Sequence, residues 1–506
     1  VFFTYLLASE FFESEAERLA AAAFVAFTPM FAFISGSVNN DNLASLLSAA
    51  ILFLLVYLSR KSVLYARQTI ILGILLGLAA LTKQSALGLF ALTGLTILYL
   101  SLRQPAMRSG HQPSAISYQP SAIGHAKRPS AIRRHSSFII HHSSFAFLPA
   151  LVISGWWYVR NLVLYGDLLG WSAFIAVLGK RAAPASLAQL WGERFSFAKT
   201  YWGLFGGINV PMPDWTYTTL NTIAALALLG CVTFFVKSFV VFLSPSLRVS
   251  TSSLHFPQFP HFLVLAHLSL IFYGLIQWAT ITWSSQGRLV YSGISGIAVL
   301  YVIGMRTILP RRIRPFAFGA IALFMAAVSA VAPFAWIAPK YADPPALTAA
   351  QLAAIPNRTD VDFGAINYPA EMRLLGYQME SASATPGGAV KVTLYWQSLV
   401  GMDRDWSVFV HVVDENQIVV AQRDTYPGLG LLPTRKWAVG QTVADTYVIP
   451  LPPTVYAPSD AHVEVGLYDY NTGERLPVVN GGQAGNEALT LSPFLIVPNR
   501  GGLPNP

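Results

Sequence analysis

Nine apolar stretches between Leu19 and Ile337 dominate this sequence of 506 residues. A membrane-spanning helix needs about 20 mostly apolar residues, and most of these stretches approach that length. With 54% hydrophobic and only 11% charged residues, the chain is unlike a soluble globular protein, so we predict a multi-pass α-helical membrane protein. The predicted spans are residues 19–36, 42–59, 69–82, 85–102, 146–164, 219–243, 261–282, 289–306 and 315–337. The third is too short to cross unaided, so we expect it to tilt, to pack inside the protein or to merge with its neighbour.

The chain begins with the apolar run VFFTYLLASE and has no initiator methionine. This run is typical of the last half of another span, because a signal peptide would carry a basic start and a small-residue cleavage site. We therefore expect the sequence to be a fragment that starts inside a partial first span.

The positive charge is unevenly distributed along the chain. Residues 1–337 carry 23 Lys and Arg against 8 Asp and Glu, whereas residues 338–506 carry 10 against 16. The basic excess belongs to the apolar part, so the net charge of +9 does not indicate a nucleic-acid partner. If residues 39–41 face outward, 16 of the 23 basic residues fall on the inner side. The positive-inside rule therefore predicts this orientation, in the plasma membrane.

Residues 103–145 separate the fourth and fifth predicted spans and repeat PSAI three times and HSSF twice. Such repetition predicts a low-complexity linker on the inner side. The segment also holds five of the ten histidines, but no carboxylate or flanking fold fixes a metal geometry for His135, His141 and His142. A solvated linker is therefore the favoured interpretation.

After residue 337 the sequence changes to short runs in which apolar and polar residues alternate. Alternation with a period of two, broken by turn residues, indicates antiparallel strands. About seven or eight such strands predict a β-sandwich over residues 338–506. This domain follows the last outward-going span, so it is expected to be extracytoplasmic. The single cysteine, Cys231, lies in a predicted span, so no intramolecular disulfide can stabilise the domain.

Several aromatic residues of this domain suit either of two roles. Trp396, Trp406, Tyr468 and Tyr470 lie on or beside the predicted strands. Aromatic rings can stack on sugars, but alternating aromatics in strands more often form the core. The core interpretation is favoured.

Four charged residues lie at the predicted outer ends of spans, namely Asp41, Lys83, Arg160 and Arg288. A charge at the bilayer centre costs about 2.5–3.5 kcal/mol, so each needs a partner, an interface or a function. Asp41 either caps the helix 42–59 or lines a site. Lys83 either extends to the membrane interface or contacts a phosphate.

The two arginines have similar alternatives. Arg160 follows the aromatic residues 156–158, which are typical of an interfacial belt with an anchoring arginine. Arg288 follows Gln286 and Gly287, where the glycine allows a tight turn before the next helix. Arg288 either anchors this loop or offers a guanidinium for bidentate contact with phosphate.

The polar groups gather on one rim of the predicted membrane domain. A transporter needs polar groups at mid-membrane and usually repeated halves, and the sequence shows neither. A site at one membrane surface with two positive side chains suits a lipid-linked phosphate, whose tail lies in the bilayer and whose head group lies just outside it.

A family resemblance agrees with this interpretation. The segments AAAFVAFTPMFAFISGSVNNDNLASLL, GLAALTKQSALGLF, WWYVRNLVLYGD and SSQGRLVYSG resemble, in this order and spacing, segments of the multi-span GT-C glycosyltransferases related to protein O-mannosyltransferases and aminoarabinose transferases. The resemblance covers about 300 residues, and its motifs are moderately specific together and weak singly. It implies transfer of a sugar from a polyprenyl-phosphate donor to an acceptor at the outer face of the cell envelope.

The resemblance also assigns candidate residues. Asp41 matches an acidic position that opens a helix in the second outer loop of the family, and Arg288 matches a basic position near its lipid-phosphate site. The principal catalytic carboxylate of the family lies in the first outer loop, upstream of Val1, so this chain alone is expected not to transfer sugar. Asp41 is the candidate catalytic residue, and the candidate substrate-binding residues are Asn39, Asn40, Lys83, Arg160, Gln286 and Arg288. No cofactor is implied, and dependence on a divalent metal stays open, as do the donor sugar and the acceptor.

Two other functions stay open at this stage. A transporter or flippase of lipid-linked saccharides would share the spans and the basic rim. A non-catalytic scaffold, whose β-domain binds glycans, would also fit the two-part organisation.

Overall fold

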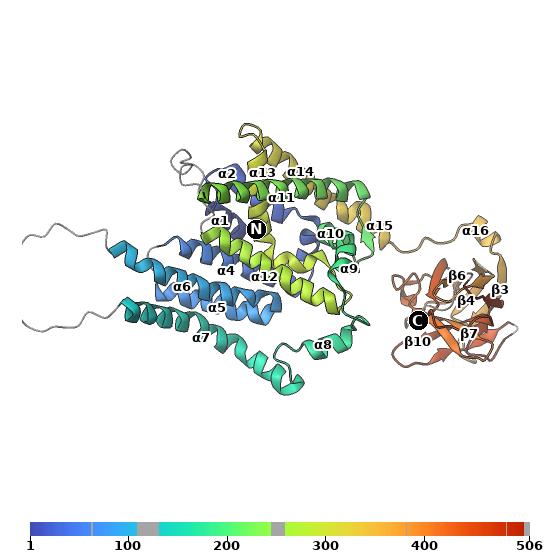
Figure 1. The fold of residues 1–506 in the computed structure, drawn as a ribbon. Helices are drawn as coiled ribbons and strands as arrows, with labels where there is room; N and C mark the ends of the chain where they lie inside the picture. Colours follow the sequence, from blue (N-terminus) through green and yellow to red (C-terminus); the bar gives the residue numbers. More distant parts are fainter. Residues whose placement is uncertain (62–63, 109–130, 244–258, 381, 482, 500–506) are drawn as a thin grey trace, which may run out of the picture. The chain divides into compact units, whose positions relative to one another are not determined.

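The chain forms two compact units, Val1–Pro339 and Lys340–Pro506, each described here by itself (Figure 1). The computed structural model describes residues 1–61, 64–108, 131–243, 259–380, 382–481 and 483–499. Unit 1 consists almost entirely of helices, and unit 2 consists mainly of strands. The prediction of several apolar helices followed by a strand-rich antiparallel region is therefore confirmed.

The helices of unit 1 form one large hydrophobic core and one small cluster around Leu58, Leu64 and Leu100. They are α1 (Phe2–Ser9), α2 (Glu15–Ala26), α3 (Pro29–Ser35), α4 (Asn40–Ser59), α5 (Ala66–Thr82), η1 (Gln84–Ala86), α6 (Gly88–Arg108), α7 (Ala131–Tyr165), α8 (Trp171–Leu178), α9 (Leu187–Gly192), α10 (Arg194–Trp202), α11 (Asp214–Leu243), α12 (Phe259–Ile281), η3 (Gly287–Gly293), α13 (Ile294–Ile308), α14 (Arg314–Ala332), η4 (Pro333–Ile337) and α15 (Ala338–Lys340), with a short hairpin of β1 (Leu204–Phe205) and β2 (Val210–Pro211) before α11.

Seven helical segments among the described residues are long and apolar enough to cross a membrane. They are Asn40–Ser59, Gln84–Arg103, Ser136–Tyr165, Asp214–Val240, Phe259–Ile281, Gly287–Ile308 and Arg314–Lys340. The other two of the nine expected spans need correction. The stretch 19–36 is a pair of helices, α2 and α3, bent by 62°. The stretch 69–82 lies in α5, which is apolar but shorter than a span.

The bend between α2 and α3 has a local cause. Pro29 is the first residue of α3, and proline has no N–H to continue the hydrogen-bond ladder of α2. Thr28 is held in an extended conformation, as expected for a residue before proline. Hydropathy alone cannot show this break, because every residue around it is apolar.

The short helix α5 packs against α7 through small residues (Figure 1). A Cβ on Gly73 would lie 2.3 Å from the carbonyl oxygen of Ala146. One turn later, a Cβ on Gly77 would lie 3.0 Å from the Cα of Ala150. Glycines and alanines four residues apart let two helix backbones approach closely, as in helix pairs of membrane proteins. The stretch does not merge with its neighbour into one helix, because η1 separates α5 from α6.

A second close contact joins α11 and α13. A Cβ on Gly304 would lie 1.8 Å from the carbonyl oxygen of Ala227, and a Cβ on Gly230 would lie 2.0 Å from the carbonyl oxygen of Gly304. No side chain fits between these main-chain atoms. The pair can therefore form only with glycine at both positions.

The predicted bounds of the linker 103–145 are wrong at both ends. Helix α6 continues to Arg108, and helix α7 begins at Ala131. Residues 109–130 lie outside the described part of the chain. The Nδ1 atom of His142, on α7, lies 3.4 Å from the Oγ1 of Thr69. No group of three or more His, Cys, Asp or Glu side chains among the described residues is arranged to hold a metal ion.

Unit 2 contains two sheets. One has the order β5-β14-β10-β7-β8, with β11 and β13 also paired to β10, and the other has the order β12-β3-β4-β6-β9. All pairs are antiparallel except β14 with β5. The strands are β3 (Asn357–Phe363), β4 (Met372–Met379), β5 (Ser383–Ala384), β6 (Ala389–Ser398), β7 (Trp406–Asp414), β8 (Val419–Thr425), β9 (Thr442–Pro450), β10 (Ser459–Asp469), β11 (Arg475–Leu476), β12 (Val478–Asn480), β13 (Leu489–Thr490) and β14 (Phe494–Ile496).

The two sheets share one hydrophobic core. Along β6, exposed and buried positions alternate, as the sequence pattern predicts for strands with one face in a core. Trp396 and Trp406 are buried in this core, so the core interpretation holds for both. Tyr470 is 70% exposed and lies outside it. Side chains from both sheets meet in the core, among them Val392, Leu394, Trp396, Val408, Val410, Val412, Val463 and Val465.

Candidate functional site

The N-terminus of α4 carries the first group of candidate residues. Asn39 is the N-cap, and its Oδ1 accepts hydrogen bonds from the backbone N–H groups of Asp41 at 2.9 Å and Asn42 at 3.3 Å. The expected cap by Asp41 is therefore wrong, because the helix begins at Asn40 rather than Asn42. An asparagine cap satisfies the free N–H groups equally well and leaves the Asp41 carboxylate for another partner.

That partner is Lys83. The Nζ of Lys83 donates to Oδ1 of Asp41, in an ion pair whose side chains are only 18% and 13% exposed. Lys83 follows the last residue of α5 with an extended backbone, and the chain then turns into η1. The Nδ2 of Asn40 donates to the carbonyl oxygen of Thr82 at 3.3 Å. Polar contacts therefore join the start of α4 to the end of α5. The residues in each pair are 42 positions apart, so the sequence does not reveal the contacts.

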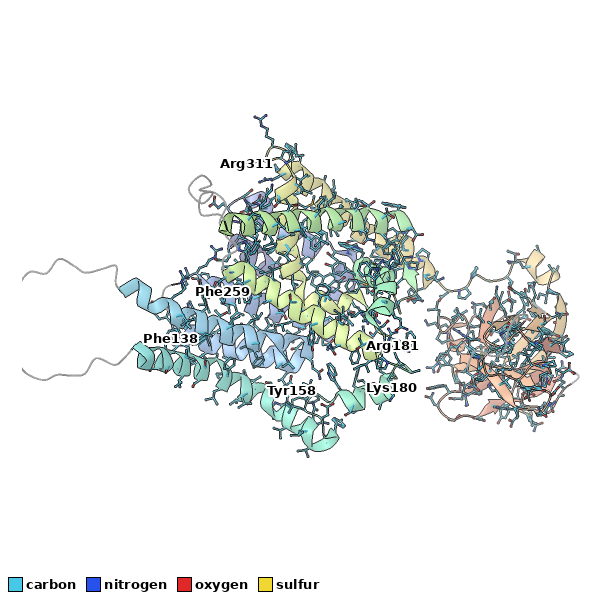
Figure 2. The ribbon with its side chains drawn as sticks, viewed as in Figure 1. Phe138, Tyr158, Lys180, Arg181, Phe259 and Arg311 are labelled. Carbon is cyan, nitrogen blue, oxygen red and sulfur yellow. The ribbon has the colours of Figure 1, made fainter. Side chains whose placement is uncertain are left out.

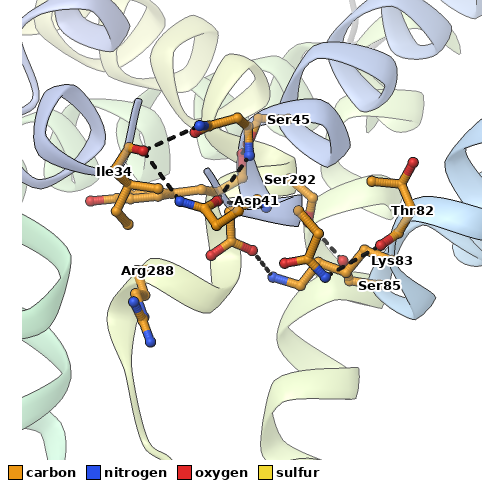
Figure 3. Close-up of polar contacts among 12 residues, drawn as sticks. Ile34, Asp41, Ser45, Thr82, Lys83, Ser85, Arg288 and Ser292 are labelled. Carbon is orange, nitrogen blue, oxygen red and sulfur yellow. Dashed lines mark hydrogen bonds and ion pairs between the residues drawn. The ribbon is translucent and has the colours of Figure 1, made fainter. Parts of the chain in front are cut away.

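The segment that carries Arg288 lies beside this ion pair (Figure 3). The Oγ of Ser45 on α4 donates to the carbonyl oxygen of Tyr291 at 3.1 Å. Tyr291 belongs to η3, the element that also contains Arg288. The structure thus brings Asp41, Lys83 and Arg288 into one region, which we call the polar cluster.

Arg288 differs from the other two members of the polar cluster in its contacts. Its side chain is partly buried, and its Nε donates to Oε1 of Gln286 at 2.8 Å. In the part of the chain that the structure describes, no salt bridge includes Arg288. Its guanidinium group therefore has donors left for a ligand.

Gly287 has a role other than the expected one. Its φ is not in the left-handed region, so a glycine-specific turn is not needed here. A Cβ on Gly287 would instead lie 2.3 Å from the carbonyl oxygen of Phe197 and 2.5 Å from the Cβ of Tyr201. The glycine is needed because α10 packs directly against the main chain before Arg288.

Arg160 contacts an aromatic ring of its own helix. It is exposed on α7, and its guanidinium group lies over the ring of Trp157, 5.0 Å from the centroid. None of the contacts found among the described residues links it to Asp41, Lys83 or Arg288. This placement agrees with an anchoring role beside the aromatic residues of α7.

Sequence reasoning missed the buried charge of Arg181 (Figure 2). Arg181 is 7% exposed, and its Nη2 donates to both carboxylate oxygens of Glu193 at 2.7 and 2.9 Å. Its guanidinium group also lies over the ring of Trp283, 4.2 Å from the centroid. Arg181 and Glu193 lie in a segment without apolar periodicity, which predicts neither a helix nor a strand. In the sequence they are only a base and an acid in a loop on the expected outer side.

The charges of the polar cluster suit an anion. Two of its side chains are cationic and one is a carboxylate, so Lys83 is balanced by Asp41 while Arg288 keeps its charge. A guanidinium group with free donors suits the oxygens of a phosphate, which it can contact with two parallel hydrogen bonds. Comparison with known protein families finds no match for the chain, and comparison with curated proteins finds none either.

Proposed function

We propose that the chain belongs to a plasma-membrane glycosyltransferase of the GT-C type, and that the polar cluster binds the phosphate of a polyprenyl-phosphate-linked sugar. In this proposal the seven long helices of unit 1 cross the bilayer, together with the bent pair α2–α3. The polar cluster lies at the outer surface, and unit 2 is extracytoplasmic. The family assignment rests on the sequence resemblance alone.

The alternation of helix directions supports one location for the cluster. Residues Asn39–Asp41 precede α4, and Lys83 follows α5, so both lie at the same end of this antiparallel pair. Arg288 lies at the start of the segment that continues into α13, which returns toward the basic residues 306–314. Basic residues gather at inner loops in membrane proteins, so the polar cluster is assigned to the outer side.

The observation that carries the proposal is the state of Arg288. A partly buried charge without a counter-ion is costly, and natural structures usually pair it. Lys83 has Asp41 as its partner, whereas the charge of Arg288 is unbalanced among the described residues. The phosphate of a lipid-linked donor would supply the missing negative charge at the membrane surface.

In the transfer step, the bond between the sugar and the phosphate oxygen breaks while an acceptor oxygen attacks the sugar carbon. The bonding electrons leave with the phosphate, whose growing negative charge Arg288 would stabilise. The proton of the acceptor must pass to a base. Asp41 is held by Lys83, so we assign it to orienting Lys83 rather than to accepting that proton.

The test measures binding of polyprenyl monophosphate to the protein in nanodiscs. Charge-assisted contacts contribute about 1.5–3 kcal/mol, so Arg288→Ala should weaken binding by about ten- to a hundredfold. Arg288→Lys should recover part of the loss, because lysine keeps the charge but not the fork. Arg160→Ala is the matched control and should bind like the wild type.

Unchanged affinity in Arg288→Ala, with thermal stability preserved, would refute the phosphate contact. Movement of the lipid between leaflets by the purified protein, without cleavage of the sugar, would instead favour a flippase.

A further inference from the structure

Residues 181–201 brace the loop 282–288, which follows α12 and includes the first two residues of η3, Gly287 and Arg288. This bracing segment comprises the chain from Arg181 through α9 and most of α10. Four of its residues, Arg181, Glu193, Thr200 and Tyr201, contact the end of α12, the loop or η3. Together they decide where the backbone of Arg288 lies.

The first contact is made by Arg181 at the end of α12. Its backbone N–H donates to the carbonyl oxygen of Ile281 at 2.8 Å. Its Nε donates to the carbonyl oxygens of Ala279 at 3.0 Å and Thr282 at 2.9 Å. The last carbonyl groups of a helix lack partners within the helix, and a cation there also interacts favourably with the helix dipole. Arg181 therefore fixes the point where the loop begins.

The second contact passes through Glu193. Its carboxylate accepts hydrogen bonds from Arg181, and its Oε2 also accepts one from the Oγ of Ser285. One carboxylate thus connects the end of α12 to the middle of the loop. Its negative charge is balanced by a guanidinium group that is itself buried, so the connection is charge-assisted.

The third contact is made by Thr200, which is 2% exposed. Its Oγ1 accepts a hydrogen bond from the backbone N–H of Gly287 at 2.7 Å. The same hydroxyl can donate to the carbonyl oxygen of Ser196 at 2.8 Å. The amide next to Arg288 therefore has its partner on α10.

The fourth contact is made after Arg288, where the hydroxyl of Tyr291 donates to the carbonyl oxygen of Tyr201. The loop is thus held by the bracing segment on both sides of Arg288. The hydrogen bond found for the Arg288 side chain goes to Gln286, two residues away in the same loop. Such a local bond cannot by itself orient the side chain toward Asp41 and Lys83.

We infer that Glu193 and Thr200 are positioning residues, which hold the Arg288 loop so that its guanidinium group faces the phosphate site. The inference rests on the proposed function for the ligand, and on the contacts above for the geometry. Binding groups displaced by about 1 Å can cost large factors in activity or affinity, so a loosened loop should weaken phosphate binding.

The experiment uses the full chain in nanodiscs with polyprenyl monophosphate as the probe. Thr200→Val removes the acceptor for the Gly287 amide while keeping a similar shape, and Thr200→Ser keeps the acceptor. Hydrogen exchange of peptides covering residues 282–291, affinity for the probe and thermal stability are measured together. Thr222→Val is the matched control, because Thr222 is exposed on α11 and bonds only within its helix.

We expect Thr200→Val to speed exchange in residues 282–291 and to weaken binding by about tenfold, as expected for a binding group held less rigidly. Thr200→Ser should behave like the wild type in both measurements. Glu193→Gln keeps an acceptor for Ser285 but loses the charge, and it should give an intermediate effect. The control Thr222→Val should change neither measurement.

Three results would overturn the inference. If the wild type binds the probe and Arg288→Ala weakens binding but Thr200→Val does not, the positioning role is wrong and the proposed function stands. If Thr200→Val and Thr200→Ser lose stability and affinity together, the role of Thr200 is structural. If the wild type does not bind the probe, the proposed function and the positioning role both fail.

Discussion

Unit 1 and unit 2 bring their elements together with opposite kinds of residue. In unit 1, α11 and α13 touch through Gly230 and Gly304, where main-chain atoms of one helix meet main-chain atoms of the other. In unit 2, large apolar side chains such as Trp396 fill the space between two sheets. Added atoms should therefore damage the first kind of contact, whereas removed atoms should damage the second.

Two carboxylates, one from each unit, have different kinds of partner. Asp41 in unit 1 is paired with Lys83 at the end of a helix. Asp445 in unit 2 is 2% exposed and accepts a hydrogen bond from the Tyr447 hydroxyl at 2.5 Å. Burial raises the pKa of Asp445 to about 6, against the effect of the hydrogen bonds from Tyr447 and the Gly428 backbone. One carboxylate is stabilised by an opposite charge, and the other is easier to protonate than an exposed one.

The largest effect should come from emptying the core of unit 2. Trp396→Ala removes a side chain that is 0% exposed, and such changes cost about 3–5 kcal/mol. Hydrogen exchange in β6 and β7 of the full chain should then rise strongly while α11 and α13 stay protected. Tyr470→Ala, at a position 70% exposed, is the control and should change little. Equal effects of the two substitutions would contradict the assignment of Trp396 to the core.

The next effect concerns the helix pair of unit 1. Gly304→Val would place a Cβ 1.8 Å from the carbonyl oxygen of Ala227, and overpacking of this kind costs about 1–3 kcal/mol or more. Gly319→Val on α14 is the control, because a Cβ there meets no atom within 4 Å. The melting temperature in detergent should fall much more for Gly304→Val. If both variants have the same melting temperature, the effect of the substitution reflects helix propensity and not the close packing at Gly304.

The smallest effect is a pH dependence in unit 2. The pKa of Asp445 is higher in the folded state than in an unfolded chain, so the folded state binds its proton more tightly. The free energy of unfolding should therefore decrease as pH rises from about 4 through about 6, by at most about 3 kcal/mol from this group. Asp445→Asn should remove this contribution, so its stability relative to the wild type should rise with pH. Hydrogen exchange in β9 between pH 4 and 7.5, corrected for the intrinsic rate, measures the difference, and a pH-independent difference would contradict the assignment.

Much of the fold could be predicted from hydropathy and periodicity. Apolar runs locate the seven long helices, and alternation locates the strands of unit 2. The break at Pro29 is harder to predict, because apolar residues continue on both sides of it. The short helix α5 is also harder to predict, because its place depends on its packing against α7. Window hydropathy measures composition and contains no information about neighbours in space.

The candidate site could be predicted only in part. The sequence NNDN offers several residues that can cap a helix, and only the backbone shows that Asn39 does so. The partners Asp41 and Lys83 are 42 residues apart, and no sequence pattern links them. Arg181 and Glu193 lie in a segment without periodicity, so the burial of Arg181 and its pairing with Glu193 could not be foreseen. Residue types could be proposed from the sequence, but their partners come from tertiary structure.

The ion pair between Asp41 and Lys83 also has a consequence for selectivity. Because these two charges cancel, the polar cluster presents one net positive charge, that of Arg288. A sugar joined to a lipid through a single phosphate is a diester with one negative charge, and the two charges match. A diphosphate-linked lipid carries additional negative charge that the cluster would leave unbalanced in a poorly hydrated site. If the proposed function holds, the polar cluster would therefore favour a lipid carrier with one phosphate over a carrier with two, before any contact with the sugar.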